Sequence, residues 1–454
     1  MAGAEIRRFS IDRQGMTLNA PIAVIASALL AFADAFLIPA IVIAAVTSRL
    51  TTELSTIGLA VSLAGGLWYL PQILATGVIQ HRRRVKPVIL LGGSLRAAAL
   101  GLFAYIGFRA DDFTETELLR WFLFSLVIAT AASAFSIPPL NALLIRAVRP
   151  DQRRQVFTIR AVLALLLAVL AGLIAARVFG AHGPGFPRSL TLVILAAAAC
   201  VAAGTFLVGL IREPKRLQPV STPTMMDGLR GATRQLRNGP FRRFVLFRTL
   251  AAITAGFDPV IIVYGLDRLG LPFAYVGYYV AAYAAARIAS GPLWIWLARI
   301  SGHRALLQAA TAFRLFALGA ALATPAIVES GFWRDNVSRP NGPAILFGLC
   351  FVLLGVGASA VAQGSFGYLN ETVPQSERFH ASSLTNTLLM IAAFAPIVIF
   401  SVAEERGLDD LLTAGAILTL IALLLSGLLT NSVATVRRPA PLSPTRVTRQ
   451  GTAR

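Results

Sequence analysis

Long apolar runs separated by short polar segments dominate this chain of 454 residues. A membrane-spanning helix needs about 20 mainly apolar residues, and twelve runs meet that requirement. The runs cover residues 20–46, 56–79, 87–108, 118–145, 157–179, 189–211, 244–266, 273–298, 305–327, 342–369, 381–403 and 409–432. Strands of a membrane barrel would alternate apolar and polar residues, whereas residues 161–171 are continuously apolar. The pattern therefore predicts an all-α membrane protein with twelve transmembrane helices.

Composition supports this prediction. The chain is 56% hydrophobic and 14% charged, with a mean hydropathy of +0.71, whereas a soluble domain carries about 25% charged residues. The first apolar run is longer than the apolar core of a signal peptide and ends without a small-residue cleavage site. We therefore expect it to remain as a membrane anchor.

An internal repeat relates the two halves of the chain. Asp34 and Asp258 each lie in the first apolar run of one half, 224 residues apart. The same spacing relates two Pro-x-x-x-Arg segments, Pro150 with Arg154 and Pro374 with Arg378. A looser repeated motif surrounds two intramembrane arginines, Arg96 and Arg314. Repeated halves of membrane helices are typical of transporters whose substrate lies between the halves. The repeat predicts two pseudo-symmetric six-helix bundles.

The runs and the polar segments between them define the expected domain organisation. We expect an N-terminal segment at 1–19, a first bundle at 20–211, a central loop at 212–243, a second bundle at 244–432 and a disordered tail at 433–454.

The distribution of charge predicts the orientation in the membrane. An even number of spans places both termini and every second loop on one side, and that side holds 28 of the 41 Lys and Arg residues, against 9 in the opposite loops. Basic residues in short loops mark the cytoplasmic side. We therefore expect cytoplasmic termini, a cytoplasmic central loop and location in the cytoplasmic membrane.

The formal net charge of +20 also raises the question of partners. Because the basic residues concentrate beside helix ends on one side, we expect them to contact the anionic inner leaflet of the lipid bilayer. This distribution argues against nucleic-acid binding. The other expected partners are a small-molecule substrate and protons, and we expect a monomer.

Twelve spans in two halves, a long central loop and basic loops after the second and eighth spans together resemble the major facilitator superfamily over nearly the whole chain. That family carries a Gly-x-x-x-Asp-Arg-x-Gly-Arg-Arg/Lys signature in these loops, and here both copies lack the acid. The resemblance implies that matching loop residues take part in gating. The residues that match, with those of the Pro-x-x-x-Arg turns, are Gly77, Arg83, Arg84, Arg154, Gly302, Arg304 and Arg378. Holding helix ends at the membrane interface is the alternative role of these residues.

Motifs for other chemistry are weak. Only two lysines exist, Lys86 and Lys215, and neither follows a glycine, so a Walker A phosphate loop is excluded. A glycine-rich stretch at 355–360 lies inside an apolar run, where small residues allow close helix packing. The four histidines lack metal-ligand spacing. We expect no enzyme activity, no cofactor and no metal.

Intramembrane charges are the remaining functional candidates. Asp34 and Asp258 are the two acids within spans, and such residues usually face a cavity or a partner because a charge in the bilayer is costly. In the family, spans one, four, seven and ten line the cavity, so the resemblance places both carboxyls there. Loss of hydration favours a protonated carboxyl, which makes both residues candidates for proton coupling. Structural pairing with an arginine is the alternative.

Arginines and polar side chains complete the candidate site. Arg96 and Arg314 lie on spans that the family places peripherally, so we expect structural roles for them. Arg287, in span eight, is expected to pair with Asp258 or to bind an anionic substrate. The remaining substrate candidates are Gln72, Tyr283 and Gln363.

The sequence thus predicts a secondary active transporter, a permease that moves a small molecule by alternating access and that couples to protons through Asp34, Asp258 or both. The alternative is a transporter-like membrane scaffold, or a lipid- or pigment-handling assembly factor, without ion-coupled transport. Neither the substrate nor the direction of transport follows from the sequence.

Overall fold

The computed structural model describes residues 2–72, 75, 82, 84–181, 183–214, 236–331, 333, 341–375 and 377–430, without the side chains of 2–17, 379, 380 and 383. Helices make up nearly all of these residues, and no strand occurs among them. The predicted all-α fold class is confirmed.

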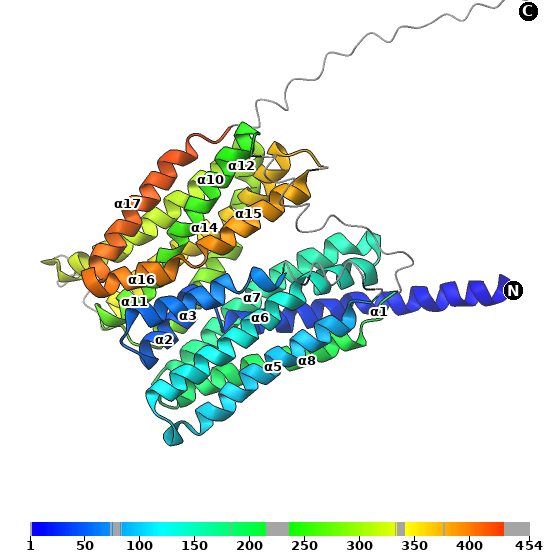
Figure 1. Ribbon diagram of the computed structural model, residues 1–454, viewed down its shortest axis with the longest axis horizontal. Helices are drawn as coiled ribbons and strands as arrows, with labels where there is room; N and C mark the ends of the chain where they lie inside the picture. The colour runs from blue at the N-terminus through cyan, green and yellow to red at the C-terminus, as the bar shows by residue number, and fades with distance from the viewer. Residues whose placement is uncertain are drawn as a thin grey trace, which may run out of the picture.

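The first half of the chain forms one bundle (Figure 1). Its helices are α1 (Ala2–Ala35), η1 (Pro39–Ile43), α2 (Ala44–Leu50), α3 (Leu54–Gly66), α5 (Lys86–Phe108), α6 (Glu115–Ala147), α7 (Pro150–Phe179) and α8 (Arg188–Leu210), with a short 3-10 turn η2 (Ala110–Asp112) before α6. Local sequence explains several helix starts. Thr114 and Glu117 form a reciprocal capping box at the start of α6, and Pro150 occupies the first turn of α7, where its missing N–H costs nothing.

The second half forms the other bundle. Its helices are α10 (Gly239–Thr254), η3 (Ala255–Phe257), α11 (Asp258–Asp267), α12 (Tyr275–Glu329), α14 (Gly342–Thr372), α15 (Arg378–Ala392), α16 (Ala395–Arg406) and α17 (Leu408–Ser426). Eleven segments of the described chain are long and apolar enough to span a membrane. The 55-residue α12 contains two spans, because Gly302 interrupts it with a non-helical backbone at φ 74°. Dividing α12 there gives the twelve spans that the sequence predicts.

Several helices begin before the predicted apolar runs. α1 continues outward to Ala2 through the segment expected as a polar N-terminal extension, and α10 begins at Gly239, five residues before the predicted seventh run. Hydropathy detects the apolar part of a helix, whereas the backbone hydrogen bonds continue through polar residues at the membrane surface. Most of the central loop, residues 215–235, and the tail from 431 onward lie outside the described residues.

Several membrane helices are broken near their middles. The first span is interrupted at 36–38 before Pro39, and the seventh at 255–257 before Pro259. The second span loosens into turns at 67–69, and the eleventh at 393–394 before Pro396. A proline removes one backbone donor and clashes with the preceding turn. Such breaks are tolerated at membrane depth only where protein or a cavity surrounds the free backbone groups.

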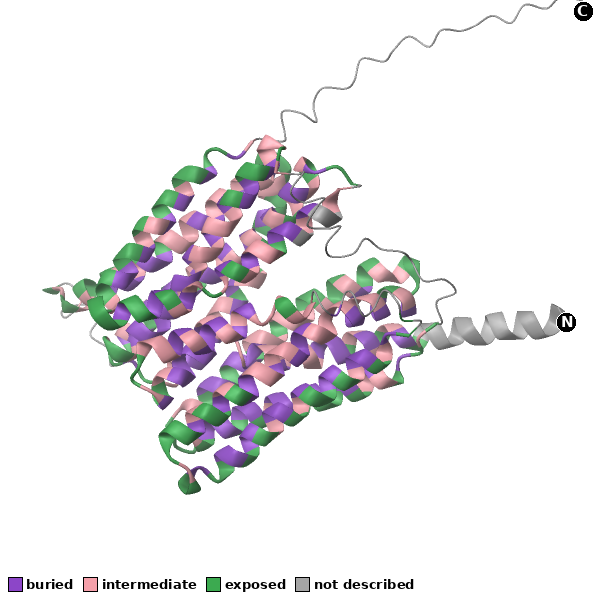
Figure 2. Cartoon of the chain, viewed as in Figure 1, coloured by how far each residue is buried: buried purple, intermediate pink, exposed green. Residues whose placement is uncertain are grey.

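The main buried cluster includes residues of both halves of the chain, and smaller clusters lie within each bundle. Figure 2 shows buried positions on the inward faces of the helices and exposed positions on the outward faces and at both ends. The exposed residues include many large apolar side chains, such as Leu166, Phe206, Phe316 and Leu424. Apolar outward faces are expected of a protein surrounded by lipid, because lipid acyl chains are as apolar as the protein interior.

The two bundles pack against one another through small residues at one end. A side chain at Gly277 of α12 would overlap with the backbone of Ala176 in α7, and one at Gly172 would overlap with Gly277 and Ala281. Small residues allow helix backbones to approach this closely. A second contact places Gly58 of α3 against Pro396 and Phe400 of α16.

Polar and aromatic contacts join the bundles at the same end. The backbone N–H of Ser55 donates to Glu404 Oε1 (2.8 Å), and the N–H of Ile397 donates to Ser62 Oγ (2.9 Å). The Arg49 guanidinium lies 5.2 Å from the ring centroid of Phe273. Within the described residues, the hydrogen bonds between the bundles involve only Ser55 and Ser62. Figure 1 shows the two bundles diverging toward the end from which α1 projects.

Close backbone contact at Gly277 leads to a prediction. Gly277→Ala should lower the free energy of unfolding by about 1–3 kcal/mol, because overpacking at a tight contact forces backbone shifts. Thermal unfolding in detergent would measure the change. Gly291→Ala, on the same helix with open space around it, is the matched control and should be neutral or slightly stabilising. Equal effects of the two substitutions would contradict the close packing of α7 on α12.

Candidate functional site

Asp34 forms an ion pair inside the first bundle. It lies in the last turns of α1, before the break at 36–38, and its Oδ1 accepts a hydrogen bond from Arg96 of α5 at 2.6 Å. The Asp34 side chain is 43% exposed, whereas that of Arg96 is 7% exposed. Because only one oxygen of the carboxylate is bonded to Arg96, the other remains accessible from the adjoining space.

Asp258 forms the equivalent ion pair in the second bundle. Arg314 donates from Nε to Oδ1 (2.9 Å) and from NH2 to Oδ2 (3.1 Å), and its NH1 donates to the carbonyl of Ala251 (3.1 Å). Both side chains are about one-seventh exposed, at 15% and 14%. Bidentate pairing fixes both partners more firmly than a single bond. The second pair is therefore the more enclosed and the more rigid.

These pairs bear on two interpretations of the sequence. Arg96 and Arg314 each bind the intramembrane aspartate of their own half, as expected for structural arginines. The expected pairing of Arg287 with Asp258 is wrong. Arg287 instead lies over the ring of Tyr283 at 5.6 Å, and its Nε is buried without a hydrogen-bond partner among the described residues. The four-residue spacing on α12 places that arginine above its own helix neighbour.

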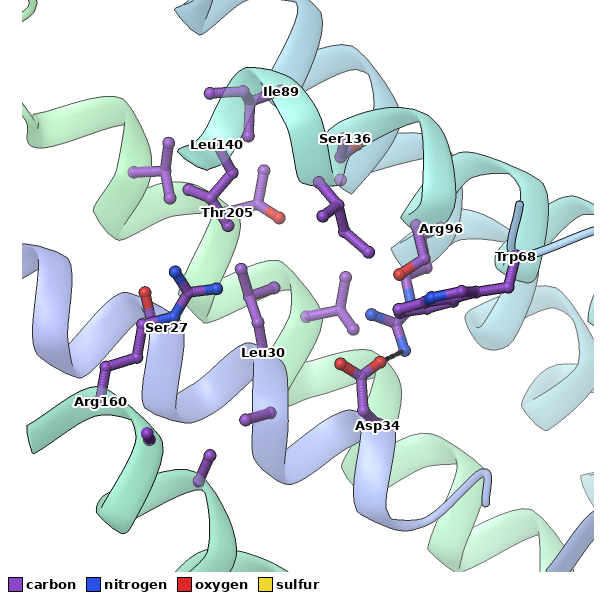
Figure 3. A pocket seen from close by; sticks show the side chains of 18 of the residues that line it. Ser27, Leu30, Asp34, Trp68, Ile89, Arg96, Ser136, Leu140, Arg160 and Thr205 are labelled. Carbon is purple, nitrogen blue, oxygen red and sulfur yellow. Dashed lines mark hydrogen bonds and ion pairs between the residues drawn. The ribbon is translucent and has the colours of Figure 1, made fainter. Parts of the chain in front are cut away.

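A cavity of about 400 Å³ extends from Asp34 into the first bundle. Figure 3 shows Asp34 and Arg96 pointing toward one another on one side of it, and Arg160 of α7 extending toward Ser27 and Thr205. Arg160 donates to Asn141 Oδ1 at 3.2 Å. The hydroxyl oxygens of Ser27 and Thr205 are buried without hydrogen-bond partners in the described chain. Unpaired buried hydroxyls are costly, so they indicate a place for a polar ligand or water.

Two more cavities continue the first toward the second bundle. A cavity of about 490 Å³ shares Asp34, Arg96 and Trp68 with the first cavity. A third, of about 400 Å³, shares Pro39 and Tyr69 with the second. The broken helices line these cavities through Pro39, Gly65, Gly256, Pro259, Ala393 and Pro396. Irregular backbone near the middle of the membrane is thus concentrated where the two bundles meet, as in substrate sites of secondary transporters.

Arg248 is a site residue that the sequence interpretation missed. It lines the third cavity together with Arg314 and with Tyr69 of the other bundle. Hydropathy groups it with the basic central loop, yet it lies nine residues into α10, about 14 Å along the axis from the first residue of that helix. Arg160, near the start of the fifth apolar run, likewise lines a cavity. A helix start placed at Gly239, supported by Pro240 at the second position, would have revealed the depth of Arg248.

Other substrate candidates lie away from the three cavities. Gln72 donates to the carbonyl of Trp68 on its own helix at 2.6 Å. Tyr283 packs against the main hydrophobic cluster below Arg287. Gln363 of α14 is half-buried. None of these three residues lines a described cavity, although Val361 and Ala362, which precede Gln363, line the third.

The Pro-x-x-x-Arg turns are related in structure, with one difference. Arg378 donates from Nε to the carbonyl of Val373 (3.2 Å) and from NH2 to Asn370 (2.8 Å). In the first half the corresponding bond runs from Arg153 Nε to the carbonyl of Val148 (3.2 Å). Arg154, predicted for this position, is exposed. Successive side chains on a helix point about 100° apart. Arg153, and not Arg154 at the matching motif position, is therefore the arginine that reaches the carbonyl of Val148.

Gly302, Arg304 and Arg84 are the remaining loop candidates whose positions the structure describes. Gly302 adopts the positive φ that favours glycine and separates the two spans of α12. Arg304 donates to the carbonyl of Gly427 (2.8 Å), as Lys86 Nζ does to Gly209 (2.6 Å) in the first half. Both cations thus hold the last helix of their bundle. Arg84 is exposed before α5, whereas Gly77 and Arg83 lie outside the described residues.

Clusters for metal binding are not found among the described residues, where no group of three or more His, Cys, Asp and Glu side chains is placed to hold an ion. Charged pairs, unpaired hydroxyls and cationic guanidinium groups define the site instead. Two helical bundles with broken helices around a central polar space are the architecture of a multi-pass membrane transporter.

Comparison with known proteins identifies the family. The model of the Major Facilitator Superfamily matches residues 23–397, and the chain belongs to that superfamily. No curated protein sequence matches the chain. Among solved structures, the nucleoside transporter NupG is 12% identical with a TM-score of 0.66, covering 93% of this chain and 100% of that one.

Two further structures share the fold. A bacterial homologue of the iron transporter ferroportin, in an inward-facing state, is 16% identical with a TM-score of 0.67, covering 92% of this chain and 98% of that one. A POT family transporter in complex with 5-aminolevulinic acid is 14% identical with a TM-score of 0.66, covering 91% and 96%. At these identities the likeness concerns the fold. The chain is a membrane transporter of this superfamily.

The second ion pair leads to a double-mutant prediction. Asp258→Asn and Arg314→Gln should each lower the free energy of unfolding by about 3–5 kcal/mol, because each leaves an uncompensated buried charge. The double variant should lose clearly less than the sum of the two. Thermal or denaturant unfolding of the purified protein measures the coupling.

Arg287→Gln supplies the matched control for that cycle. Combined with Asp258→Asn, it should give additive losses, because the two side chains are not paired. Additivity in the Arg314 cycle, or strong coupling in the Arg287 cycle, would refute the observed pairing.

Proposed function

We propose that this protein is a secondary active transporter that moves a small molecule by alternating access, through the three adjoining cavities between and within the bundles. The observation that carries the proposal is the position of the Asp34 and Arg96 pair, in which Asp34 is exposed to a cavity at a broken helix. A lipid-facing charge would be expensive. A half-exposed carboxylate within a membrane span is therefore expected to line a pathway for substrate or protons.

The one-sided packing of the bundles supports rocking as the mechanism. α7 with α12, and α3 with α16, are in contact through glycines at one end. By the distribution of basic residues, that end is the outer one, and the state described is inward-facing. Both termini and the central loop are then cytoplasmic, in the cytoplasmic membrane. Likeness to an inward-facing structure is consistent with this assignment.

The two ion pairs suit different tasks. Arg314 holds both carboxylate oxygens of Asp258 in an enclosed site, which suits a fixed structural pair. A single bond joins Asp34 to Arg96, and Asp34 faces the cavity. A proton on Asp34 would remove the charge that holds Arg96 and would release its guanidinium toward the cavity. Asp34 is therefore the proposed coupling residue, while Asp258 stabilises the second bundle.

Proton coupling is tested with Asp34→Asn in proteoliposomes. Metabolite mixtures are supplied outside, internal accumulation is followed by mass spectrometry, and a pH-sensitive dye reports proton movement. We expect the wild type to accumulate at least one compound when a pH gradient is imposed. The variant should lose gradient-driven accumulation by about 100-fold, the scale of removing a positioned proton-transfer group, while retaining exchange without a gradient.

Asp410→Asn is the control for charge removal, since Asp410 is an exposed acid at the start of α17. It should transport like the wild type. Undiminished gradient-driven accumulation by Asp34→Asn would refute the coupling role. Wild-type protein that moves no compound under any gradient would favour a scaffold or a lipid-handling factor instead.

A further inference from the structure

The arginines of the central cavities outnumber the acids that neutralise them. Arg96 is balanced by Asp34, and Arg314 by Asp258. Arg160 has an amide partner, Asn141, which carries no charge. Arg248 has no hydrogen-bond or ion-pair partner among the described residues. Each bundle therefore contributes one guanidinium group whose charge is not matched by an acid, and both groups lie beside a cavity.

From this excess we infer that the substrate is a small organic anion, whose carboxylate or phosphate oxygens are bound by Arg160 of the first bundle and Arg248 of the second. The inference rests on the proposed transport function and adds the substrate class. A guanidinium group presents several N–H donors in a planar fork that fits an oxyanion. An unmatched cation deep in a membrane protein is costly until an anion approaches it.

Position excludes the usual alternative for these arginines. A snorkelling arginine extends from near a helix end to the lipid headgroups. Arg160 and Arg248 are only partly exposed, and both line cavities inside the protein. Tyr69 of the first bundle lines the same cavity as Arg248. These guanidinium groups therefore face the transport pathway and not the lipid surface.

Two further features favour a negative ligand. Ser27 and Thr205, whose buried hydroxyls have no partners in the described chain, line the cavity that contains Arg160. They can donate to an oxyanion. α11 and α16 begin beside the third cavity, which Pro259 and Pro396 line. The N-terminal ends of helices carry partial positive charge, so they add to the field of Arg248.

Binding is tested on the purified full-length protein with probes matched in size. Succinate, glutarate and glycerol 3-phosphate are the anions, while succinamide, glycerol and 1,4-diaminobutane are neutral or cationic analogues. Thermal unfolding gives the stabilisation by each probe, and quenching of Trp68, which lines the first two cavities, gives apparent affinities against a Trp68→Phe background. We expect at least one anion to bind at least about tenfold more tightly than its analogues.

Variants then assign the binding to these two arginines. Arg248→Gln and Arg160→Gln should each weaken anion binding by about 10- to 100-fold, the scale of a hydrogen bond to a charged group. Arg248→Lys should lose less. Without anion, Arg248→Gln should unfold at the same temperature as the wild type or higher, because it removes an unmatched charge, which excludes misfolding as the cause. Arg242 of α10 and Arg177 of α7 are exposed, so Arg242→Gln and Arg177→Gln are matched controls and should bind like the wild type.

Each outcome decides one of the two proposals. No preference for anions over their analogues, or equal anion binding by Arg248→Gln and Arg242→Gln, overturns the inferred substrate class. Anion binding without any flux in proteoliposomes supports the anion site and overturns transport. Accumulation of only neutral or cationic compounds supports transport and overturns the anion site.

Discussion

The cost of placing charge inside a membrane governs this structure. A charged side chain at the bilayer centre is unfavourable by more than about 2.5 kcal/mol even on lenient scales. Each bundle meets that cost internally for its aspartate, since Asp34 pairs with Arg96 and Asp258 with Arg314. No described ion pair joins one bundle to the other. The bundles are therefore held together mainly by close packing of small residues and a few hydrogen bonds at one end, an arrangement that leaves each bundle intact when the two move.

Helix breaks give the same charges access to a ligand. Pro39, Pro259 and Pro396 interrupt three spans at the depth of the cavities, and the freed backbone groups face protein or cavity and not lipid. Because the first break follows Asp34 directly, the exposed ion pair and the cavity coincide. In the second bundle the break precedes Asp258, and Arg314 encloses it. The repeat thus preserves the pairing but differs in exposure, and this difference is the basis for proposing Asp34 as the coupling residue and Asp258 as a structural one.

Much of this fold could be predicted from the sequence, because spans are set by apolar length and the repeat is visible as a spacing. Periodicity predicts twelve spans even where α12 runs through two of them. The two aspartates were identified as candidates because intramembrane acids are rare. Their partners were not, since hydropathy gives no helix rotation and places no side chain in space. Arg96 and Arg314 have equivalent positions in the repeat, yet adjacency along the chain favoured Arg287 as the partner of Asp258.

Two other arginines show a similar dependence on coordinates. Arg248 lies only four residues into the apolar run that begins at 244, so hydropathy does not separate it from the basic loop, whereas the helix begins at Gly239. The Pro-x-x-x-Arg spacing points to Arg154, whereas the bond to the carbonyl of Val148 comes from Arg153. In both cases a shift of a few residues changes the environment of an arginine from solvent to the protein interior. Sequence patterns predict which residues are unusual for a membrane, but the contacts of these residues depend on rotation and depth, which require coordinates.

Distance measurements between spin labels would test the central claim, that two bundles, each with its own internal ion pair, move as units about their shared cavities. Labels at Arg177 and Tyr278 report on the packed ends of α7 and α12, while labels at Gln155 and Arg299 report on the opposite ends of the same spans. A bound ligand or a pH change should shift the population between the inward-facing and outward-facing states. The distance between the labels at Arg177 and Tyr278 should then lengthen, while the distance between those at Gln155 and Arg299 shortens. Labels at Arg109 and Arg188, both in the first bundle, should keep one distance. Inter-bundle distances that stay constant, or change together with the distance inside one bundle, would contradict the account.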